Sequence, residues 1–151
     1  MTRLGHMIYW CCFAIVSFVC FAISFYFFAP MSLWAEYYSI NPVSDEFVVG
    51  DQPYFISERE IFRESTLEFN DVIFCREDDE LDFNSYAYFV SGRAGIPPTN
   101  GRSKMLWPYD HSLNQAGSCY MHSTITLDLP FGVHKRQTIV GPIFKVVEAE
   151  P

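Results

Sequence analysis

The sequence lacks the short motifs that mark many enzymes and metal carriers. It has no G-x-S-x-G nucleophile elbow, no HExxH zinc motif, no CxxC pair and no glycine-rich phosphate loop. Basic residues are also scarce, with 10 Lys+Arg against 18 Asp+Glu and a formal net charge of -8. Proteins that bind nucleic acid need a basic face to neutralise phosphates. We therefore expect no enzymatic activity, no cofactor, no bound metal and no nucleic-acid partner.

Charged residues, glycine and proline are all absent from one long apolar run, residues 8–28. A helix rises about 1.5 Å per residue, so this run would span roughly 30 Å, the thickness of a bilayer's hydrocarbon core. Tyr9 and Trp10 near one end, and Trp34 beyond the other, fit interfacial aromatic belts. We predict a transmembrane signal-anchor helix that contacts the lipid bilayer through residues 8–28. A cleaved signal peptide is the alternative, although neither Ala29 nor Ala35 makes a good cleavage site.

The distribution of charge predicts the orientation of this helix. Arg3 is the only basic residue before the run, and all 18 acidic residues follow it. The positive-inside rule places residues 1–7 in the cytoplasm as a short tail. Residues 29–45 would form a juxtamembrane linker, and residues 46–151 an extracytoplasmic domain that is periplasmic or extracellular. We expect a single-pass protein of the cell (inner/plasma) membrane.

Alternation of apolar and polar residues dominates the exported part and predicts an all-β domain. Residues 118–129 place their odd positions on one apolar face, beginning with Cys119. Residues 66–75 do the same except at Asp71, and we interpret Asn70-Asp71 as a bulge or bend. Further strands are predicted over 46–49, 54–57, 83–90 and 137–147.

Turn residues separate these predicted strands. Residues 92–102, with three Gly and two Pro, form the longest predicted loop, and Pro130-Phe131-Gly132 is predicted to turn the chain. Gly141-Pro142 divides the last strand, which predicts a bulge or an edge position. About seven short strands in roughly 110 residues favour a β-sandwich, for which a Greek-key arrangement is the common solution.

The spacing of two cysteines resembles that of immunoglobulin-like domains. Cys75 and Cys119 are 44 residues apart, and Tyr88 sits about where such a domain carries its core aromatic residue. The resemblance is one of architecture, because the usual Trp is absent and Gly117 stands where a Tyr would precede the second Cys. It implies an immunoglobulin-like Greek-key β-sandwich and no particular activity.

The five cysteines fall into two groups. Cys11, Cys12 and Cys20 lie in the apolar run, where cysteine behaves as a small apolar residue. Cys75 and Cys119 lie in the exported part, on the inward faces of their predicted strands. In an oxidising compartment two such cysteines predict a disulfide.

Aromatic residues beside the predicted long loop are the candidate interaction surface. Tyr and Trp are enriched among the residues that dominate binding energy at protein interfaces. The four candidates are Tyr86, Tyr88, Trp107 and Tyr109. We expect them to contact a protein partner in the membrane or envelope.

Two other function classes stay open as alternatives. A metal or redox carrier on a cupredoxin-like sandwich would use Cys119, Met121 and His122, but strand alternation places His122 on the other face. The acidic run 77–82 offers oxygens to Ca²⁺, although it lacks the EF-hand pattern. A hydrolase with an unrecognised site is the other alternative. Asp110, His111 and Ser112 follow one another in the sequence, but adjacency does not produce a catalytic triad.

The leading hypothesis is a non-enzymatic binding or assembly component of an envelope or surface complex. Size and single-pass topology fit a bacterial protein or one encoded by a phage or prophage. None of the five Asn residues begins an N-x-Ser/Thr glycosylation acceptor, which leans the same way.

Overall fold

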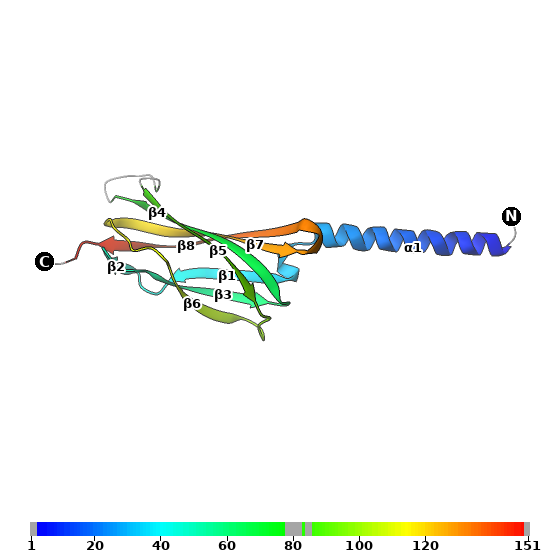
Figure 1. Cartoon of the computed structure of the whole chain (residues 1–151), viewed down its shortest axis with the longest axis horizontal. Coiled ribbons are helices and arrows are strands. Elements are labelled where there is room, and N and C mark those ends of the chain that lie inside the picture. The colour runs from blue at the N-terminus through cyan, green and yellow to red at the C-terminus, as the bar shows by residue number, and fades with distance from the viewer. Residues whose placement is uncertain (1–2, 78–82, 84–85, 150–151) are drawn as a thin grey trace. The chain divides into compact units, whose positions relative to one another are not determined.

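The chain divides into two compact units between Pro30 and Met31. The computed structural model describes residues 3–77, 83 and 86–149. The first unit is one apolar helix, and the second is a domain made mostly of β-strands (Figure 1). The predicted combination of an N-terminal apolar helix and a β-rich domain is therefore confirmed.

Helix α1 (Arg3–Phe28) includes the whole predicted membrane span and begins before it. Within the helix, Gly5–Phe28 is 24 residues long, and an 18-residue window in it has a mean hydropathy of 2.4. Such a segment is roughly 36 Å long at 1.5 Å per residue, which exceeds the thickness of a bilayer's hydrocarbon core. Pro30 follows the last turn and has no backbone N–H with which to extend the helix. The helix is thus long and apolar enough to cross a membrane.

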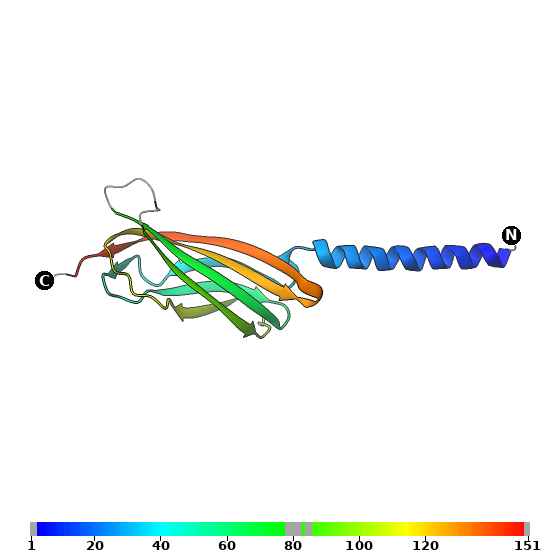
Figure 2. The same cartoon turned by 45° about the horizontal axis from the view of Figure 1, so that its top comes forward.

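The second unit is built from two β-sheets. Its described elements are η1 (Met31–Leu33), β1 (Ala35–Pro42), β2 (Glu46–Val48), β3 (Tyr54–Ile61), β4 (Ser65–Arg76), β5 (Tyr86–Ile96), β6 (Ser103–Pro108), β7 (Gly117–Leu129), η2 (Pro130–Gly132) and β8 (Val133–Val147). One sheet has the order β1-β3-β6 and the other β2-β8-β7-β4-β5 (Figure 2). Side chains from both sheets meet in a shared core, so the unit is sandwich-like.

Six predicted strands are present as β2, β3, β4, β5, β7 and β8, and β1 and β6 are additional. The predicted linker 29–45 is wrong in part, because it contains η1 and β1. The predicted loop 92–102 starts too early, because β5 continues to Ile96. Strands β1 and β6 are the outer strands of the three-stranded sheet, and pairing with β3 recruits both. Their local sequence alternates weakly, so tertiary pairing decides their structure.

The predicted bulge at Asn70-Asp71 is wrong. Strand β4 keeps an unbroken register through both residues, with Asp71 opposite Val90 on β5 and Ser123 on β7. Asp71 is 1% exposed and points into the sandwich. The irregularity in the sequence is therefore a buried carboxylic acid, and the backbone stays regular.

The predicted bulge at Gly141-Pro142 is confirmed. Tyr120 pairs with Ile143 and His122 with Val140, so two residues of β8 stand opposite Met121. A Cβ at Gly141 would lie 2.8 Å from the carbonyl oxygen of Ile40, a distance that side chains do not tolerate. Glycine therefore allows β1 to approach the bulge.

The two long sides of the sandwich differ in how they are closed. On one side, the Gln137 side chain of β8 bonds to the backbone of Tyr37 on β1. The Tyr37 N–H donates to Gln137 Oε1 at 3.1 Å, and Gln137 Nε2 donates to the Tyr37 carbonyl at 2.7 Å. On the other side lie the outer strands β5 and β6, which no ladder joins. On the side of β1 and β8, the Gln137 amide thus bonds to Tyr37 as the backbone of a neighbouring strand would.

The predicted disulfide between Cys75 and Cys119 is present. The two residues are direct partners on β4 and β7, with their Cα atoms 4.1 Å apart. The bridge therefore joins neighbouring strands of one sheet, whereas the bridge of antibody domains joins the two sheets. Aromatic rings fill the core beside it, with Phe55 contacting Phe144 and Tyr109 at ring-centroid distances of 5.9 and 6.1 Å.

Candidate binding surfaces

The four aromatic residues predicted as an interaction surface all face the core. Tyr109 is fully buried, so it offers no accessible surface. Tyr86, Tyr88 and Trp107 are partly buried and pack against the same core cluster. Inward-facing positions of β5 and β6 account for this placement. A binding role for these residues stays a prediction, and Trp107 alone lines a cavity, as described below.

The phenols of three of these residues hold the backbone together. Tyr109 Oη donates to the Tyr88 carbonyl at 2.7 Å and lies 3.2 Å from the Asp71 carbonyl. Tyr86 Oη donates to the Ala116 carbonyl, and Tyr88 Oη accepts the Asn114 N–H. Burial, with the nearby Asp71 carboxyl, raises the pKa of Tyr109 well above its usual range. Tyr109 is therefore a neutral structural donor.

A different set of apolar residues lies on the outer face of the five-stranded sheet. Register places Phe89, Val72, His122 and Val140 in one row across β5, β4, β7 and β8. The next row contains Ala87, Phe74, Tyr120 and Ile143. Phe89, Val140 and Ile143 are 66, 60 and 58% exposed. We call these two rows the outer apolar patch.

The outer apolar patch is not predicted from the sequence, because the outward positions of its strands are expected to be solvated. The signal was present in the even positions of the same strands, where Phe74 and Tyr120 stand among polar residues. Their rings stack at a centroid distance of 5.6 Å, and Phe83 meets Tyr120 edge-on at 5.0 Å. Aromatic residues on an exposed sheet face are typical of interaction sites.

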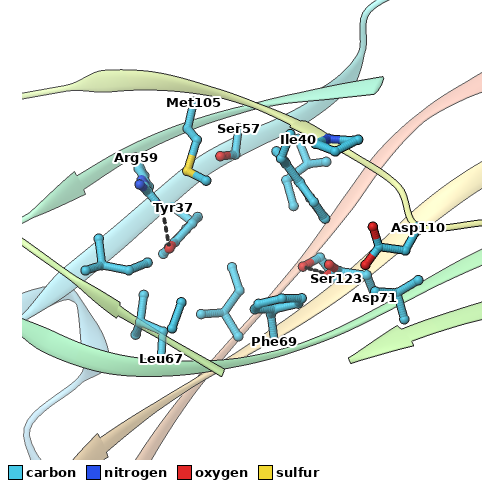
Figure 3. A pocket seen from close by; sticks show the side chains of 16 residues that line it. Tyr37, Ile40, Ser57, Arg59, Leu67, Phe69, Asp71, Met105, Asp110 and Ser123 are labelled. Carbon is cyan, nitrogen blue, oxygen red and sulfur yellow. Dashed lines mark hydrogen bonds between the residues drawn. The ribbon is translucent and has the colours of Figure 1, made fainter. Parts of the chain in front are cut away.

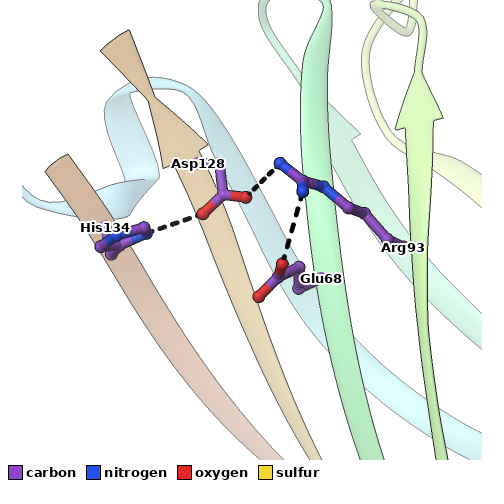
Figure 4. Close-up of polar contacts among 4 residues, drawn as sticks. All are labelled: Glu68, Arg93, Asp128 and His134. Carbon is purple, nitrogen blue, oxygen red and sulfur yellow. Dashed lines mark hydrogen bonds and ion pairs between the residues drawn. The ribbon is translucent and has the colours of Figure 1, made fainter. Parts of the chain in front are cut away.

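The opposite half of the same outer face is charged. Arg93 Nη2 lies 2.7 Å from Asp128 Oδ2, and His134 Nδ1 lies 2.7 Å from Asp128 Oδ1 (Figure 4). Glu68 lies 3.8 Å from Arg93. Both Arg93 and His134 are largely exposed, so each pair contributes little to stability. This half of the face is a solvated polar surface.

A cavity of about 360 Å³ lies between the two sheets, beside the unpaired side of β5 and β6. Its walls are mostly apolar and include Leu67, Phe69, Val90, Met105, Trp107 and Ile125 (Figure 3). Gly92 contributes to its shape, because a Cβ there would clash with the Phe69 ring. The volume falls within the range typical of small-molecule sites.

Asp71 supplies a carboxyl group at one end of this cavity. Ser123 Oγ donates a hydrogen bond to Asp71 Oδ1. Among the described residues, Asp71 Oδ2 is buried and has no hydrogen-bond partner. Burial raises the pKa of Asp71 to about 6, and the bond from Ser123 lowers it only in part. Its charge therefore changes close to neutral pH.

Arg59 lies at the other end of the cavity, beside Tyr37 (Figure 3). Arg59 Nη1 donates to Tyr37 Oη at 3.2 Å. Arg59 Nε is buried and, within the part of the chain that the structure describes, has no acceptor. Burial raises the pKa of Tyr37, and the neighbouring Arg59 offsets part of that shift. The cavity thus carries a donor and an acceptor at opposite ends.

The three residues of the copper alternative do not converge, and of the residues named for a hydrolase, Asp110 lines the cavity whereas His111 does not. Cys119 is held in the disulfide, Met121 is buried, and His122 lies on the outer face. Within residues 3–77, 83 and 86–149, no three His, Cys, Asp or Glu side chains cluster as metal ligands. The acidic run considered for Ca²⁺ lies outside the described residues beyond Glu77. His111 Nε2 lies 3.0 Å from the Phe89 carbonyl, so its ring is used to hold the backbone of β5.

Comparison with known proteins gives little likeness. No protein-family model matches the chain, and no curated protein matches its sequence. The crystal structure of the sporulation control protein Spo0M from Bacillus subtilis matches 78% of this chain at 14% identity, with a TM-score of 0.37. The match covers 51% of that chain, so this sequence spans about half its length.

Proposed function

We propose that the protein is a single-pass membrane protein whose extracytoplasmic β-domain acts as a binding and assembly component of an envelope or surface complex. The apolar α1 helix and the Cys75–Cys119 disulfide support this proposal together. A stable disulfide favours an oxidising compartment, and the helix would tether the domain to the membrane from which it was exported. A bacterial or phage-encoded envelope protein is the proposed context.

The proposed orientation has the N-terminus in the cytoplasm and the β-domain in the periplasm or outside the cell. Arg3 is the one Lys or Arg residue before the apolar run 8–28, and nine Lys and Arg residues follow the run in a strongly acidic domain. The positive-inside rule gives weight to Lys and Arg close to a span, and long exported domains translocate largely regardless of charge. Arg3 therefore favours this orientation.

We also propose a Greek-key connection for the sandwich. Strands β7, β4 and β5 lie side by side in that order in one sheet. Between β5 and β7 the chain crosses to β6 in the other sheet, and β7 then returns beside β4. A Greek key has this arrangement, with the fourth strand next to the first. The immunoglobulin-like form of this fold is proposed on the two-sheet arrangement alone, because the disulfide joins strands of one sheet.

The observation that carries the binding role is the outer apolar patch. Phe89, Val140 and Ile143 are each more than half exposed, whereas other positions of the same sheet carry Lys, Asp and Glu. Leaving such side chains in water costs free energy that a partner would recover by covering them. Aromatic residues at the centre of the patch, Phe74 and Tyr120, are of the kind that dominates protein interfaces. We propose a protein partner with a matching apolar surface.

A photo-crosslinking amino acid introduced at position 89 tests this proposal in the full-length protein in its membrane. The matched position 138 lies on the same outer face, among the threonines that border the charged half. We expect one protein of defined mass to crosslink from position 89 and none from position 138. Val140→Asp should abolish the crosslink, and Thr138→Asp should leave it intact.

Three results would overturn the proposal. They are equal crosslinking from positions 89 and 138, a crosslink that survives Val140→Asp, and crosslinks only to lipid or to a second copy of the chain. The orientation is tested separately by labelling cells with a membrane-impermeant reagent. Exposed lysines of the β-domain, such as Lys104, should react from outside the cytoplasmic membrane.

A further inference from the structure

The inter-sheet cavity is independent of the outer apolar patch, because its walls are the inward faces of the strands. The chain segments that flank β6 are each tied to a neighbouring strand. The segment after β6 is tied to β5 through Tyr109 Oη and His111 Nε2. In the segment before β6, Thr99 exchanges two hydrogen bonds with the backbone of Ile61. A cavity of about 360 Å³ suits a compact molecule better than an extended peptide strand.

The polar atoms of the cavity define what such a molecule must carry. Asp71 is 1% exposed, and its Oδ2 atom has no partner among the described residues. Asp110, from the segment after β6, lies at the same end of the cavity and points toward Asp71 and Ser123 (Figure 3). Leaving a buried carboxylate oxygen without a donor is costly, and two carboxylates at one end favour a cationic donor.

We propose that this cavity binds a compact apolar molecule that carries a primary ammonium group, which donates a hydrogen bond to Asp71 Oδ2. The apolar body would lie against Leu67, Phe69 and Trp107. The Nε–H group of Arg59 at the opposite end would donate to an acceptor on a longer ligand. On binding, the ammonium group would lose its hydrogen bonds to water. One buried, charge-assisted hydrogen bond to Asp71 would compensate for that loss.

The charged groups around Asp71 make this binding dependent on pH. Tyr37 on β1 and Arg59 on β3 face the cavity from one sheet, and Asp110 and Tyr109 follow β6. Strands β5 and β7 contribute the uncharged Val90 and Ser123. Since the pKa of Asp71 is raised to about 6, its carboxylate is present above that pH and lost below it. An ammonium ligand should therefore bind more tightly at pH 8 than at pH 5.

The test uses the full-length protein in phosphatidylcholine nanodiscs and three probes of the same shape. Phenylbutylamine carries the ammonium group, phenylbutanol carries a hydroxyl group, and phenylbutyrate carries an anion. Equilibrium dialysis against nanodiscs without protein subtracts partition into lipid. We expect the amine to bind at least about tenfold more tightly than the alcohol at pH 8, the ratio of one charge-assisted hydrogen bond, and the anion to bind weakest.

Variants separate the cavity from general apolar binding. Asp71→Asn keeps the shape of the side chain and should lower amine affinity about tenfold while leaving the alcohol unchanged. Asp110→Asn should lower it less, because that carboxyl is exposed to solvent. Ala94→Phe, at the β5 wall of the cavity, should block all probes. Thr124→Asn, the matched control one residue from Ser123 on the outer face, should change nothing.

The proposal is overturned if no probe binds above the lipid background. It is also overturned if the amine and the alcohol bind alike, or if Asp71→Asn leaves amine affinity unchanged. Thermal unfolding of each variant shows that it is folded before its binding is compared.

Discussion

Two parts of the same sandwich interior differ sharply in what fills them. Beside the disulfide, Ile73, Cys75, Cys119, Met121 and Phe144 are at most 1% exposed and pack against aromatic rings. Two residues further along the same pair of strands, Asp71 and Ser123 are the next inward-facing pair, and the cavity begins there. We call these regions the packed half and the cavity half.

The contrast lies in the side chains, because β4 and β7 keep one regular register through both halves. The packed half follows the rule that interiors are dense and apolar, which stabilises the domain. The cavity half breaks that rule with a buried carboxyl group, a buried guanidinium nitrogen and open volume. Proteins that depart from good packing locally often do so at functional sites. Stability and the proposed ligand binding thus depend on adjacent inward-facing residue pairs of β4 and β7.

The largest expected effect is the loss of a core ring from the packed half. Phe144 is 1% exposed and meets Phe47 at a ring-centroid distance of 5.4 Å. Phe144→Ala should lower the free energy of unfolding by about 3–5 kcal/mol, because it leaves a cavity in a dense core. Met105→Ala, in the cavity half, should cost less than about 1 kcal/mol, since Met105 is already 40% exposed. Denaturant unfolding measures both, and equal losses would contradict the division into halves.

Removal of the disulfide should have the next largest effect. Cys75 and Cys119 are 44 residues apart, and the chain-entropy model gives such a bridge about 3–4 kcal/mol. The double variant Cys75→Ala, Cys119→Ala should lower the unfolding midpoint accordingly. Replacing Cys11, Cys12 and Cys20 with serine is the control and should leave the unfolding of the β-domain unchanged, because these thiols lie in α1. An unchanged midpoint in the double variant would show that packing alone holds this half.

The smallest of the three effects is the dependence of stability on the charge of Asp71, in the cavity half. The pKa of Asp71 is raised from 3.8 to about 6 by burial, so the folded state holds the proton more tightly than the unfolded state. Stability should therefore be greatest below pH 4, fall between pH 4 and 6, and stay lower above pH 6. The loss is about 3 kcal/mol, at 1.36 kcal/mol per pKa unit.

Asp71→Asn removes this ionisation and should stabilise the domain at pH 7 while leaving it similar at pH 4. Chemical unfolding at a series of pH values measures the difference between the variant and the unchanged protein. Asp110→Asn is the control, because its carboxyl is exposed and should contribute little. If the two curves for Asp71→Asn and the unchanged protein run parallel from pH 4 to 7, burial does not control this carboxyl.

Much of the fold follows from local patterns. The length and hydropathy of α1, the inward odd positions of β7 and the turn at Pro130–Gly132 are all local, and periodicity identifies each one. The Cys75–Cys119 pair could be predicted because both residues are inward on strands and no other cysteine lies in the β-domain. Strands β1 and β6 could not, because pairing with β3 forms them.

The candidate sites followed the sequence less well. Aromatic residues were expected at the surface, but Tyr109 fills the core because its phenol reaches two backbone carbonyls there. The outer apolar patch needs four strands in register, and the cavity needs residues from both sheets, so neither is visible in one segment.

The apolar segment, the β character of the remainder and the inward-facing cysteines all follow from the amino-acid sequence, since periodicity and composition are local properties. Which residues of each strand gather into a site depends on how the two sheets pack. Asp71 shows the reason most clearly. In the sequence it is an acid that interrupts an apolar face, and only the second sheet, packed over it, makes it a buried carboxyl group with a raised pKa.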